Sequence, residues 1–335
     1  MIKKILIFFV DVLNQRKSLF YINTDSSYQI FRILNRISNG LLTKLLEIFI
    51  TKKNNKNFQA GYKKLKDISH EETENILKEL DKMRVYNKTK IKKIHYSNLE
   101  LDVEKFSYKI NSQDHNEAVR LDILKYDLLS NLKIAEFASQ KKWLNIIEEN
   151  FQFSPQLMDI TAWYTFPEVN TKLKSEEEET SYDAQIWHRD VDKLRDIKIF
   201  TYLTDVNDLD DGPFEILKET HTFSFDKFKF SNKNNYRILN KDIPKKYQNK
   251  KISFTGNKGT NFIVDTRCLH RGVKVKKNYR LILELYFSNS FFGKHFKFND
   301  FTRPKLNMDW DSYKFWKQKI EKEPQIYKYL FLGRD

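Results

Sequence analysis

The chain contains a single cysteine, Cys268, among its 335 residues. One cysteine excludes a disulfide bond within the chain, which is typical of proteins from reducing compartments. We therefore expect a cytoplasmic protein. We interpret Cys268 as a small buried residue and assign it no catalytic role.

Long apolar runs are also missing. No stretch approaches the roughly 20 apolar residues that a membrane-spanning helix needs. The first residues begin like a signal peptide, but the apolar run is short, Asp11 interrupts it, and no small-residue cleavage site follows. Two outcomes stay open for this segment: a helix packed on the domain, or peripheral attachment to a membrane surface. The apolar residues near one face of such a helix are Ile5, Phe8, Phe9 and Leu13.

Acidic residues are fewer than basic ones, with 45 Asp and Glu against 60 Lys and Arg, so the net charge is +15. Such a surplus favours an anionic partner such as nucleic acid or an acidic membrane surface. However, the sequence has no nucleic-acid motif, P-loop or internal repeat. Glycine and proline are scarce while lysine, asparagine, isoleucine and phenylalanine are abundant, as an AT-biased genome would produce. We prefer this compositional explanation and expect no nucleic acid partner.

Hydrophobic residues make up 40 % of the chain and aromatic residues 15 %, which is enough for a packed core. Residues 1–50 have a basic, helical pattern, and the polar run at 51–57 is typical of a linker. We expect an N-terminal helical extension over 1–50 and one domain over 51–335. The sequence does not indicate an oligomeric state.

Two helical segments precede the strands. Ser69 and Glu72 form a capping box, and the apolar spacing after them predicts a helix over 70–83. Apolar residues predict a second helical region over about 121–150.

The pattern changes to short strands from about residue 157. These segments are rich in β-branched and aromatic residues, and turn signals separate them. Helices followed by strands indicate an α+β protein with an antiparallel jelly-roll core over about 157–290. Two charged segments, 176–179 and 227–258, are interpreted as solvated loops or as lids over a site. The predicted strands cover 158–164, 197–206, 213–217, 261–265 and 279–288.

One segment combines a histidine and an aspartate at strand spacing. Residues two apart in a strand point to the same face, so His188 and Asp190 would direct an imidazole and a carboxylate to one point. His270, at the end of a later strand, offers a third ligand. Two histidines and one carboxylate leave open metal positions, as in the non-haem iron(II) oxygenases. The alternative for each histidine is a hydrogen-bonded structural residue.

Arg280 stands ten positions after His270, on an otherwise apolar strand. A buried cation without a partner is costly, so this position requires an anion. A bound dicarboxylate would satisfy the guanidinium with two parallel hydrogen bonds. A structural salt bridge, for example to Glu284, is the alternative.

These segments resemble the phytanoyl-CoA dioxygenase-like family of iron(II)- and 2-oxoglutarate-dependent oxygenases. The resemblance covers about 58–293. The chain departs from the family where Lys218-Glu219-Thr220 replaces the usual Gly-Ser before His221, and at Gly272, where many relatives have a hydroxyl residue. The segments that carry the resemblance are Trp187-His188-Arg189-Asp190, Asp211-Gly212-Pro213-Phe214, and the run from Gly259 to Gly272.

The resemblance implies a double-stranded β-helix, a cupin-like jelly roll, with iron(II) held by His188, Asp190 and His270. It also implies 2-oxoglutarate held by Arg280, O2 as the second co-substrate, and hydroxylation of a small molecule with release of succinate and CO2. Relatives that halogenate have a small residue in place of the aspartate, so Asp190 indicates hydroxylation.

Strand position and the family pattern suggest four further site residues. Thr201 and Gln185 are candidates for binding the co-substrate, and Trp163 and Thr165 for lining the substrate pocket. The rival hypothesis is a cupin-like protein without turnover, whose basic surface binds an anionic ligand. The intact ligand set and Arg280 favour the enzyme.

Overall fold

The computed structural model describes residues 60–87, 106–110, 118–149, 156–167, 183–190, 196–221, 238–288, 308–327 and 330. The predicted extension over 1–50, the linker at 51–57 and the acidic run at 176–179 lie outside these residues. Within the described residues, no helix has the length and apolar character needed to cross a membrane.

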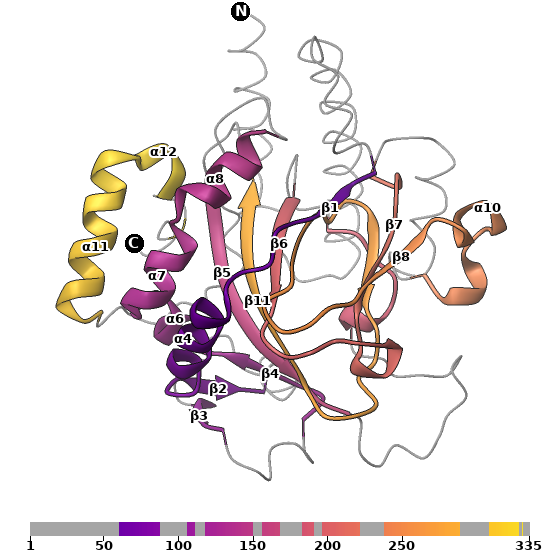
Figure 1. Ribbon diagram of the computed structural model, residues 1–335, viewed down its shortest axis with the longest axis horizontal. Coiled ribbons are helices and arrows are strands. Elements are labelled where there is room, and N and C mark those ends of the chain that lie inside the picture. The colour runs from indigo at the N-terminus through magenta and orange to yellow at the C-terminus, as the bar shows by residue number, and fades with distance from the viewer. Residues whose placement is uncertain are drawn as a thin grey trace, which may run out of the picture.

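Eight antiparallel strands form the larger of two sheets (Figure 1). Strand β11 is central to it, because it pairs with β5 on one side and with β6 on the other. In spatial order the strands are β1 (Tyr62–Lys64), β9 (Asn261–Asp265), β6 (Asp196–Tyr202), β11 (Arg280–Ser288), β5 (Gln156–Thr165), β4 (Arg120–Ile123), β2 (Arg84–Tyr86) and β3 (Tyr108–Lys109).

The smaller sheet contains β10 (Leu269–Gly272), β7 (Phe214–Leu217) and β8 (Lys251–Phe254). A further short segment joins it, because His188 forms a β-bridge with His270. Along the chain, β5, β6, β9 and β11 of the large sheet alternate with the His188 segment, with β7 and β8, and with β10 of the small sheet. This winding is that of a double-stranded β-helix, so the predicted α+β class and jelly-roll core are confirmed.

Aromatic side chains pack in part of the space between the two sheets. Phe254 of β8 and Phe262 of β9 stack with ring centroids 4.2 Å apart. The hydroxyl of Tyr202 donates to the carbonyl of Phe254 at 2.9 Å and accepts from the amide of Phe214 at 2.8 Å. Tyr202 therefore connects the sheets and satisfies two backbone groups inside an apolar core.

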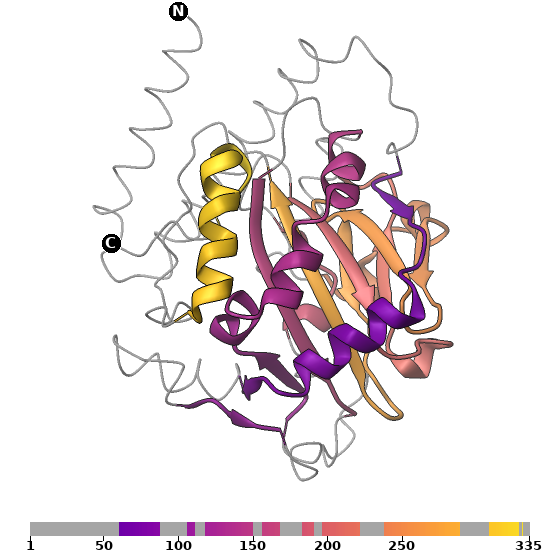
Figure 2. The same ribbon diagram turned by 60° about the vertical axis from the view of Figure 1, so that its left-hand side comes forward.

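Helices cover the outer face of the large sheet (Figure 2). Leu281, Leu283 and Leu285 of β11 pack in the core under these helices, while Ile282 packs between the sheets. Both faces of β11 are therefore buried. The helices are α4 (His70–Leu80), α6 (Lys125–Leu129), α7 (Leu132–Ala138), α8 (Lys141–Glu148), α11 (Trp310–Lys322) and α12 (Pro324–Tyr327).

The first predicted helix is confirmed and the second is corrected. The hydroxyl of Ser69 accepts from the amide of Glu72 at 3.1 Å, which caps α4 as predicted. The helix ends at Leu80, before the chain enters β2. In the second region, residues 120–123 form strand β4, and three short helices follow it. Strand pairing with β2 and β5 decides the structure there, because the alternation of charged and apolar residues over these four positions is too short to be distinguished from the helical pattern that follows.

The lysine-rich segment predicted to be a solvated loop is ordered where the structure describes it. Residues 238–258 contain α10 (Lys245–Gln248) and β8. Ile243 and Tyr247 are buried in a cluster with Trp187. These apolar residues anchor the segment against the small sheet, so the loop prediction is wrong for this part. Its earlier part lies outside the described residues.

Helix α11 docks through Trp316, which is 2 % exposed and whose indole N–H donates to the carbonyl of Leu129 at 3.0 Å. We predict that Trp316→Ala lowers the free energy of unfolding by about 3–5 kcal/mol, because it removes a buried aromatic side chain. Trp310 of the same helix is 72 % exposed, and Trp310→Ala should change the free energy by less than about 0.5 kcal/mol. Urea denaturation measures both, and equal effects would contradict this docking.

Candidate metal centre

Two reciprocal backbone hydrogen bonds place His188 beside His270. The amide of His188 donates to the carbonyl of His270 at 3.0 Å, and the amide of His270 donates back at 2.9 Å. The two ring centroids lie 4.3 Å apart. Trp187 anchors this segment, because its side chain is buried and its indole N–H donates to Oδ1 of Asn240 at 2.8 Å.

Each imidazole is oriented by a backbone carbonyl. Nδ1 of His188 lies 2.8 Å from the carbonyl oxygen of Ile186, and Nδ1 of His270 lies 2.9 Å from that of Cys268. A carbonyl oxygen only accepts, so Nδ1 carries the hydrogen in both rings and Nε2 keeps its lone pair. Metal-binding histidines are commonly held in this way.

The carboxylate of Asp190 completes the cluster. The amide of Asp190 donates to the carbonyl of Thr266 at 2.9 Å, and its Oδ2 lies 3.1 Å from Nζ of Lys198 and 3.9 Å from Nε2 of His270. Burial raises the pKa of this carboxyl, but Lys198, His270 and His188 together lower it more. The pKa therefore lies well below its usual range, and Asp190 is an anion at neutral pH.

The three ligand atoms lie within 4.8 Å of one another, and His188, Asp190 and His270 form the one such cluster among the residues that the structure describes. The 3.9 Å between Asp190 and His270 is less than twice a metal–ligand distance of about 2.0–2.2 Å, so one divalent ion can contact both atoms. Two imidazole nitrogens and one carboxylate suit iron(II) and leave coordination positions open. The residues present therefore fit the metal that the sequence predicts.

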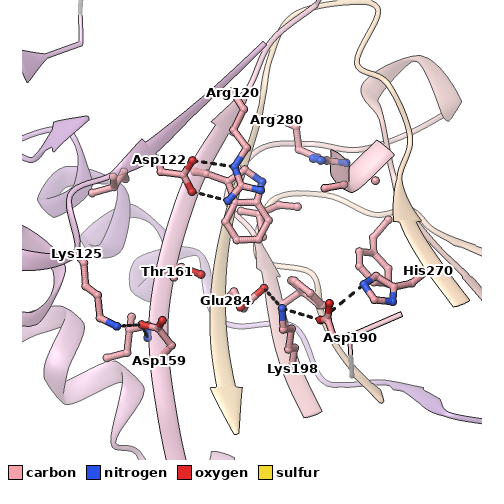
Figure 3. A pocket seen from close by; sticks show the side chains of 18 of the residues that line it. Arg120, Asp122, Lys125, Asp159, Thr161, Asp190, Lys198, His270, Arg280 and Glu284 are labelled. Carbon is pink, nitrogen blue, oxygen red and sulfur yellow. Dashed lines mark hydrogen bonds and ion pairs between the residues drawn. The ribbon is translucent and has the colours of Figure 1, made fainter. Parts of the chain in front are cut away.

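A cavity of about 360 Å³ opens beside these ligands, between the two sheets. Figure 3 shows that charged side chains from several strands point into it, with Lys198 between Asp190 and Glu284. The cavity wall contains four basic and four acidic side chains: Arg120, Lys125, Lys198 and Arg280, and Asp122, Asp159, Asp190 and Glu284.

Arg280 lines this cavity with a guanidinium group that is only partly satisfied by the described residues. The residue is 5 % exposed, and its Nε and Nη1 have no hydrogen-bond partner among the described residues. Its Nη2 makes a long contact of 3.4 Å with Oγ1 of Thr165. Burial lowers the pKa of Arg280 to about 10, so the group stays charged at neutral pH. Buried donors of this kind require an acceptor, and an anion in the cavity would supply it.

Glu284 and Gly272 bear on how the guanidinium of Arg280 is placed in the cavity. The alternative of a salt bridge to Glu284 is not what the structure has, because Glu284 pairs with Lys198 at 3.3 Å. A Cβ atom on Gly272 would lie 3.1 Å from Nη2 of Arg280. Glycine at this position, where the sequence departs from the resembled family, therefore leaves room for the guanidinium.

Of the four further predicted residues, one lines the cavity and one contacts a residue that lines it. Trp163 lines it, with the guanidinium of Arg120 above its ring at 4.3 Å from the centroid. Thr165 contacts Arg280, as described above.

The other two predicted residues do not reach the cavity wall. Gln185 ends a short 3-10 helix, and its neighbour Ala184 lines the cavity instead. Thr201 lies on the face of β6 opposite Phe200 and donates to Oδ1 of Asn261 at 2.5 Å. The alternation of side chains along β6 turns Thr201 away from the cavity, so the structure does not support a role for it in binding the co-substrate.

The sequence analysis missed most of the charged wall. Asp159, Lys198 and Glu284 each interrupt a predicted strand, and a charged residue in a strand that is otherwise apolar was the available signal. Asp122 and Lys125 fall in the region predicted to be helical, and Arg120 directly precedes it. The pairs that they form are Arg120–Asp122, Lys125–Asp159 and Lys198–Glu284.

No family model matches the chain, and no curated protein matches its sequence. Among solved structures, the chain is similar to HygX from Streptomyces hygroscopicus with nickel and 2-oxoglutarate bound, with a TM-score of 0.45, 14 % identity, and coverage of 71 % of this chain and 88 % of that one. It is also similar to SnoN, a non-heme alpha-ketoglutarate-dependent epimerase from nogalamycin biosynthesis, with a TM-score of 0.43, 11 % identity, and coverage of 74 % and 83 %. A third is AviO1 from Streptomyces viridochromogenes Tue57, with a TM-score of 0.42, 11 % identity, and coverage of 70 % and 92 %. At such identities and TM-scores, the function has to be argued from the site itself.

Cys268 directly precedes β10 and is fully buried, as predicted. Its Sγ is 3.3 Å from Nδ1 of His221. Burial raises the pKa of the thiol to about 12, and the nearby Asp265 adds to this effect. Because the thiolate is the reactive form, we predict that iodoacetamide at pH 8 leaves the native protein unlabelled and adds one group per chain in urea. Mass spectrometry measures both, and rapid labelling of the native protein would contradict the assignment.

Proposed function

We propose that the protein is an iron(II)- and 2-oxoglutarate-dependent dioxygenase that hydroxylates a small molecule, in the manner of the phytanoyl-CoA dioxygenase-like family. One observation supports this most. The same cavity contains the cluster of His188, Asp190 and His270 and the buried, unsatisfied guanidinium of Arg280. The cluster suits a metal with open positions, and the guanidinium suits the carboxylate of a co-substrate.

Each residue has a separate task in this reaction. Nε2 of His188, Nε2 of His270 and the carboxylate of Asp190 would hold iron(II) on one face, and Arg280 would bind the far carboxylate of 2-oxoglutarate through its planar fork. Once bound, iron and 2-oxoglutarate would supply the oxidation, in which one atom of O2 becomes a hydroxyl group on a substrate carbon, the other enters succinate, and CO2 is released.

The remaining contacts protect and orient this centre. Lys198 contacts Oδ2 of Asp190 at 3.1 Å and thereby fixes the carboxylate while keeping it ionised. Phe214 stacks on the ring of His270, with centroids 5.4 Å apart and planes 16° apart. An apolar ring against the ligand limits the access of water on that side.

A binding protein without turnover explains fewer of these observations. Its basic surface would hold an anionic ligand, but the cavity has equal numbers of acidic and basic side chains. Anion binding also gives no reason for two imidazoles whose Nε2 atoms converge on one carboxylate. The dioxygenase accounts for both features.

We also infer that the dioxygenase domain covers residues 51–335 and acts in the cytoplasm. A reducing location is supported by the single, buried cysteine. Light scattering of the full chain measures how many chains associate, and sedimentation with vesicles measures contact of the chain with a membrane surface.

We predict that Asp190→Ala weakens iron(II) binding by at least about 10–100-fold, because loss of a ligand should exceed the effect of changes in the surrounding shell. Anaerobic equilibrium dialysis measures the bound iron. The matched control is Asp311→Ala, which removes an exposed carboxylate from α11 and should leave iron binding unchanged. If Asp190→Ala kept full iron binding and activity, Asp190 would not be a ligand.

The same variant tests the reaction type. With Asp190 in place, three protein ligands and a chelating co-substrate would leave one of six positions for O2 and none for chloride. We therefore predict that the wild-type protein gives a hydroxylated and never a chlorinated product, with or without chloride, and that Asp190→Ala gives no hydroxylated product. Product mass spectrometry distinguishes the outcomes.

We predict that Arg280→Leu weakens binding of 2-oxoglutarate by at least about 30-fold while iron(II) still binds, because the variant removes the charged partner of the far carboxylate. Titration of the visible absorption band of the iron(II)–2-oxoglutarate protein without O2 measures this affinity. Arg280→Lys keeps the charge but loses the planar fork, so it should recover only part of the affinity. If Arg280→Leu bound 2-oxoglutarate with unchanged affinity, Arg280 would not be part of the co-substrate site.

A further inference from the structure

Three ion pairs form a continuous part of the cavity wall beside the metal ligands (Figure 3). Their side chains come from β4, α6, β5, β6 and β11. Each pair forms within the protein and needs no ligand. The pairs are Arg120–Asp122 with 2.5 Å between nitrogen and oxygen, Lys125–Asp159 with 2.5 Å, and Lys198–Glu284 with 3.3 Å.

Asp159, in the Lys125–Asp159 pair, retains hydrogen-bonding capacity toward the cavity. The side chain of Asp159 is 30 % exposed, and its Oδ1 interacts with Lys125 and with the amide of Ile160. Its Oδ2 has no hydrogen bond among the described residues. Thr161 follows on the same face of β5 and lies opposite Glu284 of β11. A carboxylate oxygen of Asp159 and the hydroxyl of Thr161 therefore line the same stretch of the cavity wall.

A ligand that covers this wall removes its polar groups from water and must offer hydrogen bonds in return. An acyl chain offers no hydrogen bonds, so it would leave the charged groups desolvated without compensation. Amino and hydroxyl groups can donate to the carboxylates, and hydroxyl oxygens can accept from the lysines and the arginine. The wall therefore selects for polar ligands.

We propose that the substrate is a polar molecule carrying several amino or hydroxyl groups, and not an acyl chain or another lipid. This inference rests on the proposed function, because the ligand is taken to be the molecule that the metal centre oxidises. Lys198 contacts both Glu284 and Asp190. A group bound at Glu284 would therefore lie next to a metal ligand, which places the neighbouring carbon within reach of the chemistry.

Three pools of compounds test the class of substrate. The first contains amino acids, polyamines and amino sugars, the second contains sugars and polyols without nitrogen, and the third contains fatty acids and acyl-CoA thioesters. The protein is loaded with Mn(II) and 2-oxoglutarate without O2, and the shift in its melting temperature is measured with each pool. Succinate release with iron(II) and O2 provides the second measurement.

We expect the first or second pool to raise the melting temperature and to stimulate succinate release, while the third does neither. The first two pools distinguish an aminated from a purely hydroxylated substrate. A response to the acyl pool, or none to either polar pool, overturns the inference. Failure of 2-oxoglutarate itself to raise the melting temperature would instead refute the proposed function, so the two failures are distinguishable.

A paired substitution tests the wall directly. The double variant Lys125→Met with Asp159→Leu replaces one ion pair by apolar side chains of similar size, an exchange that folded proteins often tolerate without loss of stability. We expect the active polar compound to bind at least about 10-fold more weakly, while Mn(II) and 2-oxoglutarate bind as before. Unchanged binding of the polar compound would exclude this wall from recognition.

The matched control is Lys133→Met with Glu136→Leu. These residues form an ion pair at 3.1 Å on the exposed side of α7, and neither lines the cavity. Binding of the polar compound should be unchanged in this control. If both double variants lowered binding equally, the effect would come from general loss of surface charge, and the inference would fail.

Discussion

The exchange of two backbone hydrogen bonds between His188 and His270 is the interaction on which the site depends. Residues that face each other in this way in an antiparallel pair have Cα atoms about 5.5 Å apart. Two imidazoles therefore become neighbours through main-chain geometry alone. The strand period then turns Asp190 to the same face, where its amide pairs with Thr266. The metal ligands converge because the small sheet forms, and the chain needs no direct side-chain contact to bring them together.

The charges of the cavity follow from this arrangement. One lysine, Lys198, contacts both Asp190 and Glu284, so two carboxylates share one cation. A divalent ion at Asp190 would take over part of that role and leave Lys198 more fully to Glu284. The metal site and the polar wall are therefore linked through a single side chain. A substitution of Lys198 would disturb both, which is why the tests of the wall use Lys125 and Asp159 instead.

Much of this site could be predicted from the sequence because its key signals have a period of two. His188 and Asp190 share a face by spacing, and Arg280 is conspicuous as a cation in an apolar strand. The wall was harder to predict, because which face of a strand meets the cavity depends on pairing between distant segments. Thr201 illustrates this, since the neighbouring residue Phe200 lines the cavity in its place. A shift of one residue in the pairing of a strand would turn each of its side chains to the opposite face of the sheet.

Sheet pairing also explains the remaining errors of the sequence analysis. Residues 120–123 alternate charged and apolar side chains over only four positions, which is too short to separate a strand from the helical pattern that follows. Contact with β2 and β5 decides for the strand. The segment 238–258 looked solvated because lysines dominate its composition. Its structure is set by a few apolar residues, among them Ile243 and Tyr247, that pack against the small sheet. The average composition of a segment does not reveal these few buried residues. Each of them contributes more to the free energy of folding than several exposed residues do.

Strand β11 shows why the polar interior is better explained by function than by stability. Its leucines pack under the helices, while Arg280, Ile282 and Glu284 line the cavity. A strand buried on both faces is most stable with apolar residues on both. Charged groups on the inner face cost desolvation, and ion pairing often recovers this only in part. Glu284 forms an ion pair with Lys198, but two nitrogens of the Arg280 guanidinium have no hydrogen-bond partner among the described residues. Its cost is offset only when an anion enters the cavity, so the structure is most readily understood as one completed by its ligands.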